Sequence, residues 1–197
     1  MTKPVTDDVT IRPGWDTGDW SGMPPVTIHP YDPDWVERYE HARQAIERAL
    51  TGLAVVIEHI GSTSVPGLGA RNGIDIQIGV THPADMVVCV ERLRQEGFHY
   101  HYFIEPDHAH LSGQGCKLHL IPVESAGWTE MPLFRDYLRQ HPETRDAYYR
   151  LKQDLAREHG QNGQRYVDGK QAFVQAVVEQ ARREVLHTRT EHATYDG

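Results

Sequence analysis

A hydroxyl-rich turn and a carboxylate follow each other in the segment IEHIGSTSVPGLGARNGIDIQIGV, residues 57–80. Gly61 lets the backbone approach a ligand closely, and the hydroxyl and N–H groups of Ser62 and Thr63 can face a phosphate. The same residues can instead form the N-cap of a helix, because turns rich in serine and threonine are common. The turn is therefore a candidate phosphate site with a structural alternative.

Asp75 lies within the strand-like run GIDIQIGV, residues 73–80. Because side chains alternate along a strand, Asp75 and Gln77 share one face and the isoleucines share the other. A carboxylate in such a strand costs free energy unless it is paired, hydrogen-bonded or bound to a cation. We therefore expect Asp75 to have a partner, and the preceding turn offers candidates for it.

The first half of the chain predicts alternating helices and strands. A helix is expected after YDPDW, with Asp32 as its cap and Pro33 at its first position. The apolar runs LAVVIEHI (53–60) and GIDIQIGV are typical of strands. A second helix is expected from Pro83 to near Gly97.

Helices dominate the second half after two further strands. The strands are predicted at 98–105 and 116–123, with a turn around SGQG between them. Three helices are expected at 130–141, 142–159 and 168–186, the last beginning with a capping box of Asp168 and Gln171. The pattern predicts an α+β (α/β-like) fold, with a small mixed β-sheet flanked by helices and a helical C-terminal part.

Length and composition indicate one globular domain. The chain has 197 residues, of which 39% are apolar and 24% charged, so it can bury a substantial core. We expect an N-terminal extension at 1–25, a domain at 26–186 and a polar tail at 187–197. The extension contains Trp15 and Trp20, and it either is mobile or packs on the body or on a second subunit.

The net charge and the cysteine content limit the kinds of binding partner and the cellular compartment that we expect. A formal net charge of −8 argues against a nucleic-acid footprint, although local basic residues can still hold a small anion. Cys89 and Cys116 lack metal-site spacing and suit a reduced cytosolic protein. Without a signal peptide or an apolar stretch of about 20 residues, we expect a cytoplasmic protein with no membrane partner.

Several motifs together resemble a known family. YDPDW, IEHIGSTSVPGL, IDIQIGV, KLHLIPV, LFRDYLRQHPE and YVDGKQAFV are similar to the GrpB-like family of the nucleotidyltransferase superfamily, which is related to polymerase β. The resemblance runs from about Val26 to Arg183, and its most specific part is the run from Glu58 to Leu68 followed by the Asp75 strand.

The resemblance implies a nucleotidyltransferase fold, in which a Gly-Ser turn holds nucleotide phosphates and the next strand presents carboxylates that bind Mg²⁺ or another divalent cation. Asp75 matches the first carboxylate, but Gln77 occupies the second position. The best-aligned later strand offers His119, with Lys117 on the same face. We therefore predict Asp75, Ser62 and His119 as catalytic residues and Asp75 and His119 as metal ligands; a softer metal bound through His119, or no metal, are the alternatives.

Basic residues that such chemistry requires also match family positions. Arg135, Lys152 and Lys170 do so, and Arg71 stands where the family usually has lysine. An ordinary solvated helix face is the alternative for each. Either Glu58 or His59 is expected to face the site. The histidines at 99, 101, 108 and 110 are structural residues or metal ligands. The predicted substrate-binding set is Gly61, Ser62, Thr63, Glu58, His59, Arg71, Gln77, Lys117, Arg135, Lys152, Tyr166 and Lys170.

Two functions of different class follow. The first is a nucleotidyltransferase-like enzyme that acts on a nucleotide or another phosphate-bearing small molecule. The second is a non-catalytic binding or folding-assistance module with the same fold, because similar domains in the family are fused to dephospho-coenzyme A kinase. A homodimer is a further expectation.

Overall fold

The computed structural model describes residues 25–105 and 108–193. The expectations for Trp15 and Trp20 fall outside these residues. The helices are α1 (Asp34–Ala49), α2 (Met86–Gln95), α3 (Ala126–Gln140), α4 (Pro142–His159) and α5 (Gly163–Ala193), and the strands are β1 (Val55–Ile60), β2 (Ile74–Val80), β3 (His99–Glu105), β4 (His108–Gly113) and β5 (Cys116–Pro122). Two 3₁₀ turns, Ser62–Ser64 and Pro83–Asp85, follow β1 and β2.

The five strands form one mixed sheet in the order β1-β2-β5-β4-β3. The β2 and β5 strands are parallel, and the other neighbouring pairs are antiparallel. The predicted α+β class with a small mixed sheet is confirmed. The β2 strand lies between β1 and β5, so Asp75 and Gln77 each have a neighbour on both sides.

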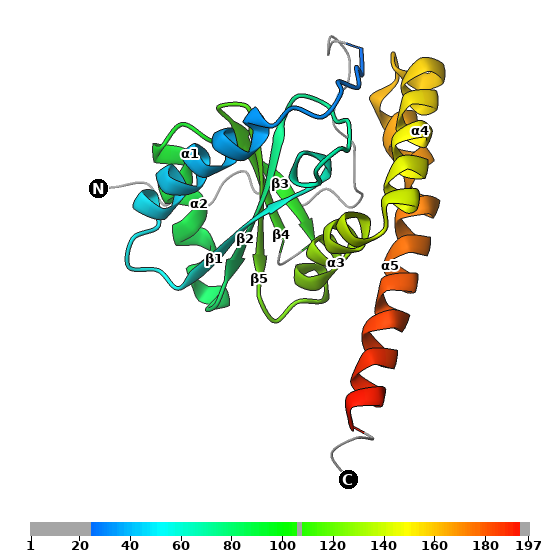
Figure 1. The fold of residues 1–197 in the computed structure, drawn as a ribbon. Coiled ribbons are helices and arrows are strands. Elements are labelled where there is room, and N and C mark those ends of the chain that lie inside the picture. Colours follow the sequence, from blue (N-terminus) through cyan, green and yellow to red (C-terminus); the bar gives the residue numbers. More distant parts are fainter. Residues whose placement is uncertain (1–24, 106–107, 194–197) are drawn as a thin grey trace, which may run out of the picture.

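Helices cover the two faces of the sheet differently (Figure 1). The apolar face, which carries the isoleucines of β2, packs with α1 and α2 into the main core around Trp35, Ile46 and Leu93. A second, smaller core joins α3, α4 and α5 to Val65 and Leu68 of the segment after the Ser62–Ser64 turn. The polar face of β2 therefore looks toward the C-terminal helices.

One strand was not predicted, and the predicted start of the last helix is wrong. The segment before SGQG is a strand, β4, which pairs with both β3 and β5; its sequence HAHLSG has too few apolar residues to indicate one. The capping box at Asp168 is absent, because α5 starts earlier, at Gly163, where the Asn162 side chain accepts a hydrogen bond from the Arg165 N–H (3.1 Å). Asp168 instead accepts one from Gln164 within the helix (2.8 Å).

Other boundaries differ from the expectation by a few residues. The first helix begins at Asp34, and Asp32 accepts a hydrogen bond from its N–H (3.0 Å), as expected of a cap. The α3 helix starts at residue 126 rather than 130 and contains Pro132. The α5 helix continues to Ala193, so the first part of the predicted polar tail is helical.

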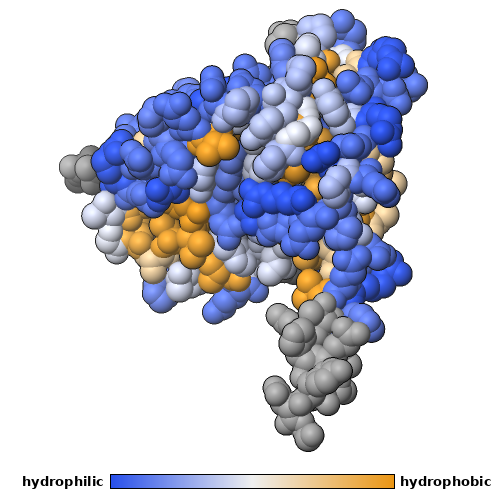
Figure 2. Space-filling view, viewed as in Figure 1, coloured by the Kyte–Doolittle hydropathy of each residue, from blue (hydrophilic) through white to orange (hydrophobic). Residues whose placement is uncertain are grey.

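The surface in Figure 2 is mostly hydrophilic, with a hydrophobic area on the side where β1 and α2 lie. Val56 of β1 and Val87 and Val88 of α2 are exposed. The homodimer stays a prediction. In the described part of the chain, no helix has the length and apolarity that a bilayer crossing requires.

Candidate functional site

The hydroxyl-rich turn and Asp75 are in direct contact. Gly61 has φ +70° and ψ −172°, a conformation that residues with a Cβ rarely adopt. A Cβ placed on Gly61 would lie 2.5 Å from Asp75 Oδ2. The sheet register explains the contact, since the last residue of β1, Ile60, pairs with Asp75. The absence of a side chain at position 61 is therefore what lets the carboxylate pack against the turn.

Lys152 joins the turn to the helical part of the molecule. Its side chain comes from α4 and is almost fully buried, with 2% of its surface exposed. The ammonium group donates to Ser62 Oγ (2.9 Å) and to the carbonyl oxygen of Gly69. It also lies 4.9 Å from the centre of the Tyr148 ring, a cation–π distance.

Lys170 and Arg71 share the ring of Tyr166. The Lys170 nitrogen lies 4.7 Å from the ring centre, and the Arg71 guanidinium carbon lies 5.5 Å from it. Tyr166 itself is buried, with 1% exposed. The Asp75, Arg71 and Lys170 side chains are half-buried, so solvent or a ligand can reach them, whereas Lys152 is buried.

Burial and neighbouring positive charges lower the pKa of both lysines. Burial, and then the neighbouring Lys170, lower the pKa of Lys152 to about 7, while Asp75 acts in the opposite direction. Burial, and then Arg71, lower the pKa of Lys170 to about 8, again against Asp75. Lys117, which pairs with Asp75 across β2 and β5, adds to the repulsion on Lys170. Positive charge therefore exceeds negative charge around this carboxylate.

Arg135 and Glu58 support the turn from behind. The Arg135 guanidinium on α3 donates to Glu58 Oε2 (2.7 Å) and to the carbonyl oxygen of His59 (2.9 Å), and it also pairs with Asp136 (2.7 Å). Arg139, one helical turn later, donates to the carbonyl oxygen of Ser64 (2.7 Å). Arg135 and Arg139 thus bond carbonyl oxygens at both ends of the turn, and the two arginines together form a clamp on it.

His59 and Thr63 also contact each other. Their Nε2 and Oγ1 atoms are 2.9 Å apart, and the His59 ring stacks on Tyr39 with 4.5 Å between ring centres. Burial, followed by the charges of Arg139 and Arg135, lowers the pKa of His59 to about 4. His59 is therefore neutral at physiological pH and holds the turn.

Gln77 and His119 lie farther along the sheet than Asp75. They are direct partners in the β2–β5 register, whereas Asp75 pairs with Lys117. Gln77 is fully buried and donates to the carbonyl oxygen of Trp128 (2.8 Å). His119 faces His108, with 3.3 Å between His108 Nε2 and His119 Nδ1. The structure thus gives Asp75 and His119 different neighbours.

The residues around Asp75 do not fit a hard cation such as Mg²⁺. Such ions need several oxygen ligands and compensating negative charge, but position 77 supplies an amide that is bonded to Trp128, and Lys117, Lys152 and Lys170 surround the carboxylate. Among the described residues, no three or more His, Cys, Asp or Glu side chains are grouped as metal ligands.

Two residues of the site, Tyr148 and Arg139, are absent from the predicted binding set, although Arg139 belongs to the basic residues that the sequence offers for an anion. Tyr148 stacks against Lys152, and its spacing of four residues on one helix face is a signal that could have indicated it. Arg139 contacts the turn across 75 positions of sequence, and no local pattern marks that contact. The structure brings together eight of the predicted residues, namely Gly61, Ser62, Arg71, Asp75, Lys117, Lys152, Tyr166 and Lys170.

Comparison with known proteins agrees with the motifs. The model of the GrpB protein family matches residues 25–180. The chain belongs to the GrpB family. A UPF0157 protein of Halalkalibacterium halodurans is 36% identical over 162 residues, which cover 79% of this chain and 82% of that protein. The family resemblance inferred from the motifs is confirmed.

A solved GrpB structure shares the fold. The conserved protein GrpB from Enterococcus faecalis superimposes with a TM-score of 0.73 and 27% sequence identity, covering 81% of this chain and 99% of that one. A cytoplasmic RNA terminal U-transferase matches more weakly, with a TM-score of 0.45 and 13% identity over 64% of this chain.

Proposed function

We propose that this GrpB-family protein binds the phosphate groups of a nucleotide or a similar small anion between the Gly61–Ser62 turn and the Lys152–Lys170 pair. One arrangement carries the proposal: the buried Lys152 ammonium donates to Ser62 Oγ of the turn, while Lys170 and Arg71 both lie against the Tyr166 ring. Positive charges held together in this way repel one another and are poorly solvated, and a bound anion relieves both effects.

The residues of the site have different roles in binding the anion. Ser62 presents a hydroxyl next to the Lys152 ammonium, so both can contact the same phosphate oxygen. Arg71 and Lys170 both lie near the Tyr166 ring, and each can offer its positive charge to the bound anion. Asp75 limits the net charge of the empty site and contacts the turn through the gap that Gly61 leaves.

We restrict the proposed activity to binding. Nucleotidyl transfer with two metal ions about 3.5–4 Å apart needs clustered carboxylates to hold both ions. Gln77 supplies an amide at the second position, and its nitrogen is committed to Trp128. These features favour the binding module over the enzyme among the two functions that the sequence suggests.

Calorimetric titration tests the proposal. Adenosine triphosphate and inorganic tripolyphosphate are titrated into the full chain at pH 7, each with and without Mg²⁺. We expect binding of both without Mg²⁺, and a loss of about tenfold or more in affinity, about 1.4 kcal/mol per tenfold, for Lys170→Met. Arg157→Met, which removes an exposed charge from α4, is the matched control.

The result that counts against binding is equally definite. If neither anion binds at millimolar concentration, or if Lys170→Met and Arg157→Met weaken binding equally, the site does not hold phosphate. Binding that requires Mg²⁺ would restore the metal-dependent alternative.

A further inference from the structure

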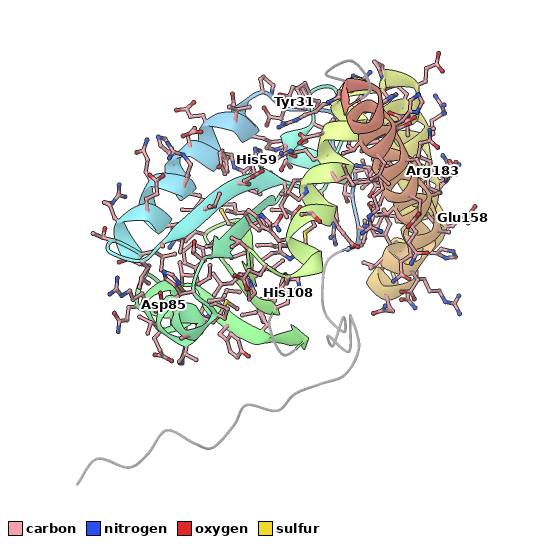
Figure 3. The ribbon with its side chains drawn as sticks, turned by 90° about the horizontal axis from the view of Figure 1, so that it is seen from below. Tyr31, His59, Asp85, His108, Glu158 and Arg183 are labelled. Atoms are coloured by element: carbon pink, nitrogen blue, oxygen red, sulfur yellow. The ribbon has the colours of Figure 1, made fainter. Side chains whose placement is uncertain are left out.

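A group of histidines lies on strands at the polar face of the sheet, whereas Lys152 and Lys170 lie on helices. His101, His108, His110 and His119 come from β3, β4 and β5. The His110 and His119 ring centres are 4.8 Å apart, and those of His101 and His110 are 5.9 Å apart. In Figure 3, the labelled His108 lies well away from His59, which contacts the turn, so this end of the group is separate from the turn.

The spacing of two of these rings matches metal coordination. His108 Nε2 and His119 Nδ1 are 3.3 Å apart. Two imidazole nitrogens bound to one tetrahedral ion at about 2.0–2.1 Å lie about 3.3–3.4 Å from each other. The two rings are tilted by 45° with their centres 5.4 Å apart, so they converge without stacking. An ion can therefore replace the proton that otherwise lies between these nitrogens.

A buried oxygen on the same face as this pair lacks a hydrogen-bond donor among the described residues. Gln77 is 0% exposed, and its Oε1 accepts no hydrogen bond from the described part of the chain, although its Nε2 donates to Trp128. Gln77 is the β2 partner of His119, and paired residues on parallel strands present their side chains on the same face. Native proteins rarely leave such an acceptor unsatisfied, and a bound cation is one explanation.

The ligand chemistry suits a soft metal. Imidazole nitrogens are common ligands of Zn²⁺, Ni²⁺ and Cu²⁺. Lys117 is also close to these rings; its charge disfavours a hard cation, which binds by charge alone, more than a transition metal bonded to nitrogen.

We propose that His108 and His119, with the amide oxygen of Gln77, form a site for a single transition-metal ion of the Zn²⁺, Ni²⁺ or Cu²⁺ class, completed by water. The site adds a metal function to the proposed anion binding and does not depend on it, since its ligands are separate from Lys152 and Lys170. Two histidines and an amide are also compatible with the absence of larger His, Cys, Asp or Glu groups among the described residues.

Metal titration of the untagged, chelator-treated full chain tests the site. We expect one Zn²⁺ per chain with micromolar affinity, measured by competition with a chromogenic chelator. His108→Ala and His119→Ala should each weaken binding at least tenfold, and Gln77→Leu should weaken it less. His29→Ala and His82→Ala, which remove exposed histidines, should change it less than twofold.

A measurement on the unmodified protein guards against a folding defect in the variants. With one equivalent of Cu²⁺, the electron paramagnetic resonance spectrum should show coupling to two imidazole nitrogens. Coupling to none or one, affinity weaker than about 100 µM, or a His108→Ala variant that binds as tightly as His82→Ala would each overturn the site. Tripolyphosphate binding by His108→Ala should be unchanged, which separates this outcome from failure of the anion site.

Discussion

The Lys152 ammonium lies 2.9 Å from Ser62 Oγ, although 90 positions of sequence separate the two residues. The contact brings a helix of the C-terminal part onto the turn that follows the first strand. Since Lys152 is buried and positively charged when protonated, it costs folding free energy in the absence of an anion. The pair is thus both a link between two parts of the fold and the core of the proposed binding site.

The first prediction concerns the stability of Lys152→Met. The folded protein lowers the pKa of Lys152 to about 7 from 10.5, so between these pH values the unfolded chain binds the proton more strongly. The wild type therefore loses stability as the pH falls through this window, by up to about 1.4 kcal/mol per pH unit. The variant lacks this loss, so relative to the wild type it should gain stability between pH 10 and pH 7.

Urea denaturation at pH 7, 8.5 and 10 measures the effect. Arg157→Met, which removes an exposed charge from the same helix, should differ from the wild type by a constant amount across these pH values. A constant difference for Lys152→Met would show that the buried amine keeps its ordinary pKa in the folded protein.

The second prediction is that anion binding takes up protons. Below pH 7 both lysines are charged before binding, but at pH 8 Lys152 is mostly neutral and Lys170 half neutral. A bound anion raises both pKa values, so protons should be taken up at pH 8 and affinity should fall above it. Titration of tripolyphosphate in two buffers with different ionisation enthalpies measures the proton count.

Lysine-labelled protein provides a direct check on this second prediction. The chain has four lysines, Lys3, Lys117, Lys152 and Lys170, so carbon-13 side-chain resonances can be assigned by substitution. Lys152 and Lys170 should titrate near pH 7 and pH 8, and tripolyphosphate should raise both pKa values. Heats that are equal in both buffers at pH 8 would contradict the proposed linkage.

The third prediction compares two glycines with positive φ. Gly52 has φ +84° and no atom within 4 Å of an added Cβ, whereas at Gly61 that Cβ would meet Asp75. Gly52→Ala should cost about 1 kcal/mol of unfolding free energy for its backbone conformation alone. Gly61→Ala should cost about 1–3 kcal/mol more and weaken anion binding. Equal losses would mean that Asp75 moves aside freely.

The fourth prediction concerns the clamp on the turn. Arg135 is 11% exposed in its ion pair with Glu58, whereas Arg182 is 42% exposed in its pair with Glu130. Arg135→Met should lower the unfolding free energy by about 2–4 kcal/mol, because it leaves a partly buried carboxylate and a carbonyl oxygen without their donor. Arg182→Met should cost below about 1 kcal/mol. Thermal and urea unfolding of both variants would show similar losses if the clamp were dispensable.

Local patterns predicted the first half of the fold better than the second. The alternation of IDIQIGV was sufficient to place Asp75 on the polar face of β2, and the glycine before Ser62 indicated the close approach that the structure shows. The β4 strand was missed because its histidines hide the apolar period. The start of α5 was misplaced because Asn162, and not Asp168, provides the cap.

The assembly of the site was beyond local patterns. Arg71, Lys152 and Lys170 lie on three different segments, and the family resemblance, rather than any spacing, suggested that they act together. The 3.3 Å pair of His108 and His119 depends on the β4–β5 register, which could not be derived while β4 itself was unrecognised. Long-range pairing therefore set the limit of what the sequence revealed.

The proposed anion site lies between the two parts of the fold that build the two hydrophobic cores. Asp75 belongs to the sheet, which packs on the main core, while Lys152 and Lys170 belong to helices that build the smaller one. An anion bound by residues of the sheet and of the helices would have to dissociate before the C-terminal helices could separate from the strands. A bound anion would then slow amide hydrogen exchange in α4 and in α5 to a similar extent, because the two helices could open only together and only after the anion had left.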